Sequence, residues 1–222
     1  SKIKGILVEN GLIPSGWATT EEIRNALKKF RESGKFVISY SDYLLTQECY
    51  YLSTAADKIY INPGAMVDFK GLSSEVMFYK KALAKIGVEV QVTRHGKFKG
   101  AVEPFLFDKM SDENREQIKD YAGSIWNQVL ADISESRGIS VDNLNLIADK
   151  LDGNIASRAL AVNLVDGIMF RDGLLDTLKT LSGISSDKDL NLISMVKYTK
   201  AVKSVSSSYG KGRISVIYAE GT

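Results

Sequence analysis

The chain has 222 residues, of which 44% are hydrophobic and 25% charged, as is typical of a globular protein with a sizeable core. Its net charge of +2 is too small to predict nucleic acid or an anionic membrane surface as a partner. Its one cysteine, Cys49, excludes an internal disulfide and a thiolate metal site, and its one histidine, His95, excludes most zinc sites.

The first half of the chain alternates strand and helix patterns. Runs rich in Ile, Val and Tyr predict four strands, at 3–9, 35–40, 58–62 and 88–92. Apolar residues at helical spacing predict helices between them, over Ile23–Phe30, Leu45–Leu52 and Tyr79–Ile86. Repeated strand–helix–strand units indicate an α/β fold with a parallel sheet and crossover helices.

Polar residues mark where several of these helices begin or end. Thr19 and Glu22 have the spacing of a capping box, and Asp42 is a candidate cap for the second helix. Ser111 is a candidate cap for a long helix in the second half of the chain, and Gly138 is placed to end it.

The second half changes to a helical region. After the long helix, shorter helices are expected near 140–150, 155–163, 171–181 and 189–194. Residues 182–212 are rich in Ser, Lys and Gly and are interpreted as a connector. RISVIYAEG then resumes the strand pattern with which the chain opened.

Both ends of the chain are abrupt. SKIKGILVE opens directly on a strand pattern, and GRISVIYAEGT stops just after another one. We expect both ends to be cut from a longer protein, which leaves room for an amino-terminal anchor before residue 1. No apolar run within the chain approaches the ~18 residues that a membrane-spanning helix needs, and no secretory signal is visible.

The stretch RHGKFKGAVEPF, residues 94–105, is the strongest candidate for chemistry. It sets Arg94, His95, Lys97 and Lys99 within six residues, beside an apolar run and after an expected strand, where open α/β sheets carry functional loops. Apolar surroundings and neighbouring cations both lower the pKa of a lysine, and a neutral lysine can take a proton from a serine hydroxyl. The alternative is a solvated basic surface loop.

Other reactive side chains have plainer interpretations. Glu9 and Asp68 are lone carboxylates near strand ends and are expected to be structural. Cys49 lies on an apolar helix face, which favours a packed thiol over a nucleophile. Trp126 is expected in the core or at an interface, and His95 either tunes the basic loop or lies on the surface.

Three segments resemble one known family. GKFKGAVEPF (96–105) is similar to the lysine motif G-x-Y-K-S-A-V-E-P-F of bacterial signal peptide peptidase A, also called protease IV. The segment SYSDYLLTQECYYLSTAADKIYINPGAMVDFKG (39–71) resembles the amino-terminal half of that family, and NLVDGI (163–168) resembles its G-L-V-D-G segment. The resemblance covers most of the chain.

The resemblance implies a crotonase/Clp-protease-like fold and a serine-type peptidase with a Ser/Lys dyad. In the long bacterial form two such domains lie in tandem, the first supplying a lysine base and the second the serine. Position by position, Lys99 matches that base. Two positions depart from the pattern: Gly100 replaces the serine that follows the lysine, and Gln47 stands at the nucleophile position.

The same resemblance implies the domain organisation. Residues 1–181 are expected to form the amino-terminal domain, truncated at its start, and 182–212 the connector. Residues 213–222 are then the first strand of a catalytic domain whose serine is missing, so the fragment alone is expected to be inactive because it lacks the nucleophile and its oxyanion donors.

Partners and location also follow from the resemblance alone. Family members degrade released signal peptides, so the expected substrates are extended, apolar peptides. They act as homo-oligomers, here expected as a tetramer, anchored in the bacterial inner membrane on its periplasmic face through a segment absent from this chain. No metal, cofactor or nucleic acid is expected.

Two other functions stay open. The chain is alternatively a non-catalytic scaffold of the same chamber, as Gln47 and Gly100 suggest; substitutions on the Trp126 helix face would then dissociate the assembly. A weaker alternative, based on the shared fold alone, is a relative of the acyl-CoA hydratases.

Overall fold

The computed structural model describes residues 3–9, 13–93, 95–96 and 99–201 of the chain. The strand expected at 213–222 and the side chains of Arg94 and Lys97 therefore lie outside the described residues. The helices are α1 Trp17–Arg31, α2 Gln47–Ser53, α3 Lys80–Lys85, α4 Glu103–Leu106, α5 Asp112–Arg137, α6 Val141–Lys150, α7 Ala156–Ala161, α8 Arg171–Ser182 and α9 Met195–Ala201, with a 3-10 turn, η1, at Gly100–Val102.

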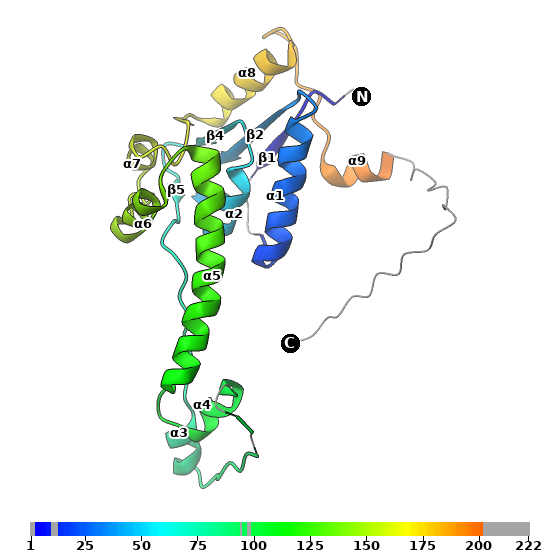
Figure 1. The fold of residues 1–222 in the computed structure, drawn as a ribbon. Helices are drawn as coiled ribbons and strands as arrows, with labels where there is room; N and C mark the ends of the chain where they lie inside the picture. The colour runs from blue at the N-terminus through cyan, green and yellow to red at the C-terminus, as the bar shows by residue number, and fades with distance from the viewer. Residues whose placement is uncertain (1–2, 10–12, 94, 97–98, 202–222) are drawn as a thin grey trace, which may run out of the picture.

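A parallel sheet forms the centre of the body (Figure 1). Its strands run in the order β1 (Gly5–Glu9), β2 (Phe36–Ser41), β4 (Lys58–Ile61) and β6 (Gly167–Ile168). A separate pair is formed by β3 (Leu44–Leu45) and β5 (Met66–Val67). In the central strand, Ile38 is in register with Leu7 on one side and Lys58 on the other. The α/β fold with a parallel sheet, crossover helices and a following helical region is confirmed.

Helices cover both faces of this sheet, and β2 contributes to both interiors. Ile38 and Tyr40 pack with Leu174 and Leu178 of α8 on one face. Ser39, on the opposite face, donates a hydrogen bond to Ser53 of α2 at 2.8 Å. Alternate strand residues point to opposite faces, which explains why β2 is buried almost throughout.

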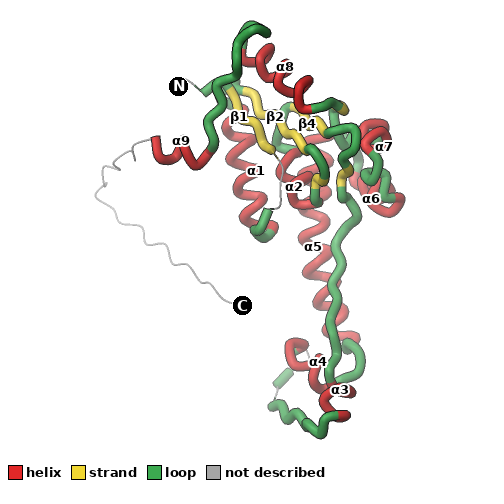
Figure 2. Tube along the Cα trace, turned by 180° about the vertical axis from the view of Figure 1, so that it is seen from behind, coloured by secondary structure: helices red, strands yellow, loops and turns green. Residues whose placement is uncertain are grey.

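The larger core lies on the α2 face of the sheet, and Figures 1 and 2 show the helices and strands around it from opposite sides. It joins the sheet, α2, the carboxyl-terminal half of α5 and the following helices. Its fully buried members include Tyr50, Ile59, Leu130, Ile133 and Leu144. Residues of α2, α5, α6 and β4 thus meet in one interior, which holds α5 firmly at one end.

The connection from β4 to β6 carries an arm that projects from the body. We define the arm as the described residues between 72 and 118, which comprise α3, η1, α4 and the first turns of α5 (Figures 1 and 2). Among those described residues only Glu103 and Asn114 are buried. The arm therefore has almost no apolar core, and its only buried side chains are polar.

The prediction of a fourth strand at 88–92 is wrong. These residues follow α3 in the arm as mostly exposed, irregular chain. A strand needs a partner for its backbone groups, and the arm holds this segment away from the sheet. The helix expected at 189–194 is also displaced, because the structure places α9 at Met195–Ala201.

The sequence predicted both ends of α5 correctly, but not the starts of α1 and α2. Ser111 caps α5 by accepting a hydrogen bond from Asn114 N at 3.2 Å, and Gly138 ends that helix with φ +66°. The prediction of a capping box at Thr19 is wrong, because α1 begins earlier, with Gly16 as its N-cap residue. Asp42 is also not a cap: α2 begins at Gln47, with Thr46 as its N-cap residue.

A buried arginine joins α1 to α2 and α5. Arg24 is 1% exposed and lies over the Tyr51 ring, with its guanidinium carbon 5.0 Å from the ring centroid. Its Nε donates to Thr54 Oγ1 at 3.1 Å, and Nη2 donates to the Asp132 carbonyl at 2.9 Å. Asp132 also accepts a hydrogen bond from the Tyr51 hydroxyl at 2.5 Å. A buried cation with several partners is costly to remove, because it leaves those partners unsatisfied.

Arg24→Met is therefore expected to lower the free energy of unfolding by about 3 kcal/mol. The matched control on the same helix is Lys28→Met, whose exposed pair with Glu135 predicts a loss below about 1 kcal/mol. Urea unfolding followed by circular dichroism measures both. Equal losses in the two variants would contradict a structural role for Arg24.

Candidate functional site

Lys99 lies in the arm, immediately before the 3-10 turn η1. Its side chain is exposed, and no ion pair or hydrogen bond joins its amine to another described residue. Its backbone, with φ −94° and ψ 67°, is not helical, so Lys99 is the last residue before the chain turns into η1 and α4. His95 is exposed as well, which fits a surface imidazole.

The Glu103 carboxylate holds the Lys99 segment against the long helix. Glu103 is fully buried, and its oxygens accept hydrogen bonds from Ser111 N at 3.1 Å, Ser111 Oγ at 2.5 Å and Asn114 Nδ2 at 3.1 Å. Ser111 and Asn114 form the first turn of α5, where the helix dipole favours a negative charge. The acidic residue of the GKFKGAVEPF motif therefore has a structural explanation, as an anchor at the start of α5.

Gly100 faces the same cluster. A Cβ atom built on Gly100 would lie 2.4 Å from Asn114 Oδ1 and 2.5 Å from Asn114 Cγ, far inside contact distance. The Asn114 amide thus occupies the space into which a side chain at position 100 would point. No sequence motif singled out Asn114; the available signal was its position three residues after Ser111, in the first turn of a capped helix.

Gln47 lies in the body, at the first position of α2. Its Oε1 accepts hydrogen bonds from Lys70 N and Gly71 N, both at 2.9 Å, and its Nε2 donates to Gly71 O at 3.0 Å. Gly71 has φ +90°, a conformation that glycine adopts without strain. Gln47 therefore clamps the segment that leaves the body toward the arm, and it supplies no nucleophile.

Lys99 and Gln47 lie far apart within the chain. Gln47 bonds to the residues after Phe69, and the Phe69 ring lies 5.3 Å from the Trp126 ring of α5. Lys99 lies next to Gly100, which contacts Asn114 near the other end of the same helix. At 1.5 Å per residue, Asn114 and Trp126 are separated by about 18 Å along α5, beyond the reach of a lysine side chain.

The carboxylate of NLVDGI ties β4 to the end of α5. Asp166 accepts hydrogen bonds from Ile59 N at 2.9 Å and from Arg137 Nη1 at 2.8 Å, and its other oxygen is 3.3 Å from Lys58 Nζ. Burial by itself would raise the pKa of Asp166, but the bonds from Arg137 and Ile59 outweigh it, and the pKa is lowered. This motif residue is structural.

The remaining candidates are part of the packing. Cys49 is fully buried, and burial raises the pKa of its thiol, which confirms a packed residue. Glu9 pairs with Arg171, and Asp68 pairs with Lys70 at 3.0 Å. Trp126 packs on the core and donates to Asn145 Oδ1 at 3.1 Å. Within the described part of the chain, no cluster of three or more His, Cys, Asp or Glu residues could hold a metal ion.

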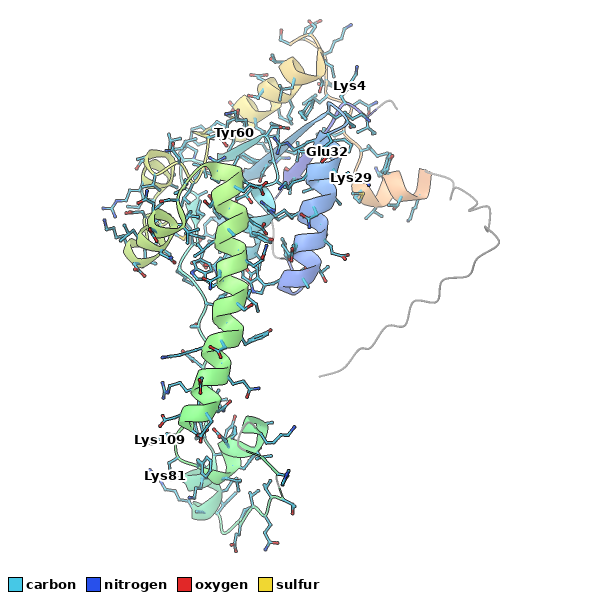
Figure 3. All side chains as sticks on the ribbon, viewed as in Figure 1. Lys4, Lys29, Glu32, Tyr60, Lys81 and Lys109 are labelled. Carbon is cyan, nitrogen blue, oxygen red and sulfur yellow. The ribbon has the colours of Figure 1, made fainter. Side chains whose placement is uncertain are left out.

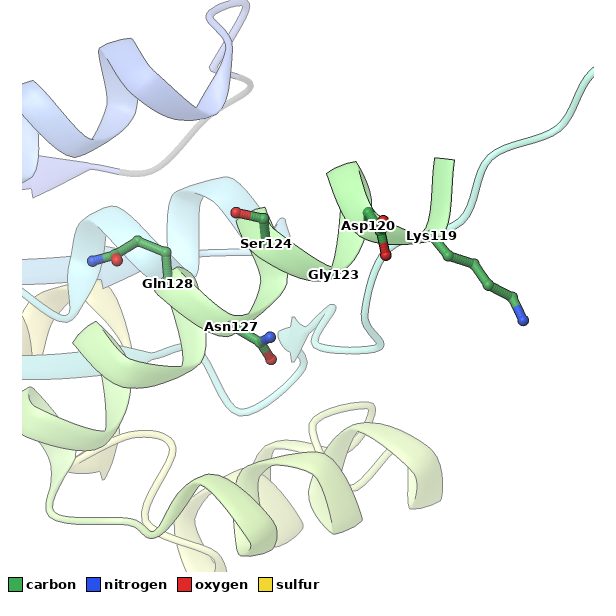
Figure 4. A pocket seen from close by; sticks show the side chains of 6 residues that line it. All are labelled: Lys119, Asp120, Gly123, Ser124, Asn127 and Gln128. Atoms are coloured by element: carbon green, nitrogen blue, oxygen red, sulfur yellow. The ribbon is translucent and has the colours of Figure 1, made fainter. Parts of the chain in front are cut away.

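A polar hollow on α5 is the other surface feature near the arm. Figure 4 shows that a single helix lines it, with side chains that do not converge on one point. Gly123, which lacks a side chain, leaves part of this space open. The hollow therefore lacks the converging groups that a catalytic site needs. Its lining residues are Lys119, Asp120, Gly123, Ser124, Asn127 and Gln128.

Comparison with known sequences agrees with the motifs. The family model described as Peptidase family S49 matches residues 29–185. The chain is 34% identical over 230 residues to Protease 4 of Haemophilus influenzae, covering 100% of this chain and 37% of that protein. It is 34% identical over 206 residues to Protease 4 of Salmonella typhi, covering 90% and 33%.

A plant relative matches over the same extent. The chain is 27% identical over 222 residues to the chloroplastic serine protease SPPA of Arabidopsis thaliana, covering 100% of this chain and 32% of that protein. The chain thus spans about a third of the length of these curated relatives. Among solved structures, a ClpP1 mutant from Listeria monocytogenes is similar with a TM-score of 0.47 and 11% identity, covering 78% of each chain.

Glu103→Ala is expected to loosen the Lys99 segment without unfolding the body, because it removes the shared acceptor of Ser111 and Asn114. We expect amide hydrogen exchange over the first turns of α5 to accelerate at least about tenfold, while the β2 and β4 amides stay protected. Glu116→Ala, an exposed change on the same helix, is the control. Unchanged exchange near Ser111 would contradict the anchor.

Asp166→Asn is expected to lower the free energy of unfolding by about 2–3 kcal/mol near neutral pH. Because the folded pKa of Asp166 is lowered, its stabilisation is present above the unfolded pKa of about 3.9 and is lost as pH falls through the folded value. The difference from the wild type should therefore shrink below about pH 4. Urea unfolding at several pH values tests this, with the exposed Asp149→Asn as control; a pH-independent difference would contradict it.

Proposed function

This chain belongs to peptidase family S49, and we propose that it is the lysine-bearing part of a serine peptidase in which Lys99 is the general base. The serine nucleophile would come from residues outside these 222. Residues 1–181 are proposed as the lysine-bearing domain and 182–212 as the connector, which includes α9. The observation that carries the proposal is the position of the motif lysine: its segment is anchored in the arm through Glu103, and its amine is paired with no other described residue.

The proposed chemistry is acyl transfer. A neutral Lys99 amine accepts the proton of a serine hydroxyl while the oxygen attacks the peptide carbonyl carbon. The resulting ammonium gives its proton to the leaving amine as the peptide C–N bond breaks, and an acyl-enzyme remains. Water then repeats the sequence, with Lys99 again as base, and releases the acid.

Two features support a site assembled from separate parts. Gln47, at the expected nucleophile position, carries no hydroxyl and is bonded to the backbone of Lys70 and Gly71. Lys99 is exposed in this chain, whereas a lysine base needs water excluded around its amine. Another domain or another subunit would supply both the serine and the surface that excludes water from the Lys99 amine.

Extended, apolar peptides such as released signal peptides are the proposed substrates, and a homo-oligomer, with a tetramer as the expected form, is the proposed assembly. The arm supports this assembly because it exposes large apolar side chains, whose burial needs a neighbour. They include Met77, Tyr79, Ile86, Val88 and Phe105.

An inner-membrane location facing the periplasm is proposed from the family resemblance. The relatives named Protease 4 come from bacteria. In the described part of this chain no helix has the length and apolar character that would let it cross a membrane. An anchor would therefore belong to a segment other than the described helices.

A scaffold is the second candidate function, and Gln47 is the observation that favours it. The expectation that changes on the Trp126 helix face would dissociate such a scaffold stays a prediction, and Trp126 itself is partly buried against this chain's own core. The exposed apolar residues of the arm are the better surface for that test.

The decisive experiment compares hydrolysis of a hydrophobic fluorogenic peptide by the full-length protein, by its Lys99→Met variant and by the 222-residue fragment. We expect Lys99→Met to reduce kcat by a hundred- to ten-thousand-fold, roughly the contribution of a general base. The fragment is expected to be inactive. Lys109→Met, an exposed lysine of the same arm labelled in Figure 3, is the matched control and should keep full activity.

The outcomes separate the two candidate functions. Loss of activity in Lys99→Met, with unchanged thermal unfolding and an active Lys109→Met, supports the base. Full activity in Lys99→Met would overturn it and leave the scaffold. Loss of activity on replacing Met77 and Ile86 by Ser, with loss of the oligomer in light scattering, would assign the arm to assembly.

A further inference from the structure

The orientation of the Asn114 amide is determined by its contact with Glu103. A carboxylate oxygen can only accept a hydrogen bond, so the amide nitrogen of Asn114 must face Glu103 Oε2, at 3.1 Å. The amide group lies across the space beside Gly100: a Cβ atom built there would be 2.4 Å from Oδ1, 2.5 Å from Cγ and 2.7 Å from Nδ2, so Oδ1 is the amide atom nearest to that position. The side chain is 8% exposed, and both of its neighbours in this contact belong to the segment that carries Lys99.

The second feature is the hydrogen-bonding capacity of the Asn114 amide oxygen, which is an acceptor. Among the described residues, no hydrogen-bond donor reaches Asn114 Oδ1. It lies 2.4 Å from the point where a Gly100 Cβ would be, and Gly100 is bonded directly to Lys99. A lysine amine carries only donors besides its lone pair, so it is a chemically suitable partner for this oxygen.

We propose that Asn114 is a positioning residue for the Lys99 base. In the assembled site its Oδ1 accepts one N–H of the Lys99 amine, which restrains the flexible side chain and directs the nitrogen lone pair at the serine hydroxyl. The amine accepts the serine proton and releases it to the leaving group, while the bond to Oδ1 persists through both steps. This inference rests on the proposed function of Lys99.

Gly100 leaves open the space that the Asn114 amide occupies. Because the Asn114 amide occupies the space beside its Cα, a side chain at position 100 and an amide at position 114 exclude each other. A hydroxyl at position 100 would reach the same region once the amide is removed. Gly100 has an ordinary backbone φ, so serine or alanine fits its conformation. Gly100 and Asn114 can therefore be replaced together, with serine or alanine at position 100 and alanine at position 114.

Four variants of the full-length protein test the inference by peptide hydrolysis. Asn114→Ala should lower kcat about tenfold with little change in KM, because the base is misplaced rather than the substrate. Gly100→Ser combined with Asn114→Ala should recover most of kcat, since the hydroxyl provides a new acceptor. Gly100→Ala with Asn114→Ala fills the same space without an acceptor and should stay low. Gly100→Ala alone displaces the amide and should also be low.

Each result decides the inference. Wild-type kcat in Asn114→Ala, or equal kcat in the serine and alanine double variants, would overturn it. If Asn114→Ala does not fold, Gly100→Ala gives the same decision, since wild-type kcat there would contradict the role of the amide. Lys99→Met, assayed in parallel, separates the two claims: an active Lys99→Met removes the proposed function itself, whereas an inactive one with silent Asn114 variants removes only the positioning role.

Discussion

The buried carboxylate of Glu103 is the contact on which the geometry around Lys99 depends. The arm has no apolar interior that could hold its loops, and its two buried side chains are Glu103 and Asn114 among those described. The segment next to Lys99 is therefore held by hydrogen bonds to one charged group, which are stronger than neutral ones and are strengthened further by burial. Ser111, which binds Glu103, also caps α5 by accepting a hydrogen bond from Asn114 N at 3.2 Å, so the helix and the Lys99 segment are stabilised together.

That contact matters because α5 is continuous from the arm to the body. The helix has 26 residues and a length of about 39 Å, and its far end is enclosed by the core around Leu130 and Ile133. Arg24 joins this end to α1 and α2, and Asp166 joins it to the sheet. A rigid helix held at one end by packing and at the other by Glu103 places Lys99 at a defined distance from the sheet.

The placement has a functional consequence under the proposed mechanism. A base carried on an arm, far from the Gln47 position of its own body, serves a nucleophile that another domain or subunit brings to it. The arm lies inside the connection between β4 and β6, so it can vary without disturbing the strand order. Gln47 then has a structural role: its hydrogen bonds to Gly71 fix the point where the chain leaves the body toward the arm.

The sequence by itself determined the elements whose cause is local. The strands at 35–40 and 58–62 and the ends of α5 at Ser111 and Gly138 follow from side-chain periodicity and from caps that act within four residues. The motif identified Lys99 as a candidate base, although not its surroundings. Tertiary structure alone decided that 88–92 is no strand, that Asn114 meets Gly100 and that Gln47 bonds to Gly71. These depend on partners distant in sequence, which local patterns do not encode.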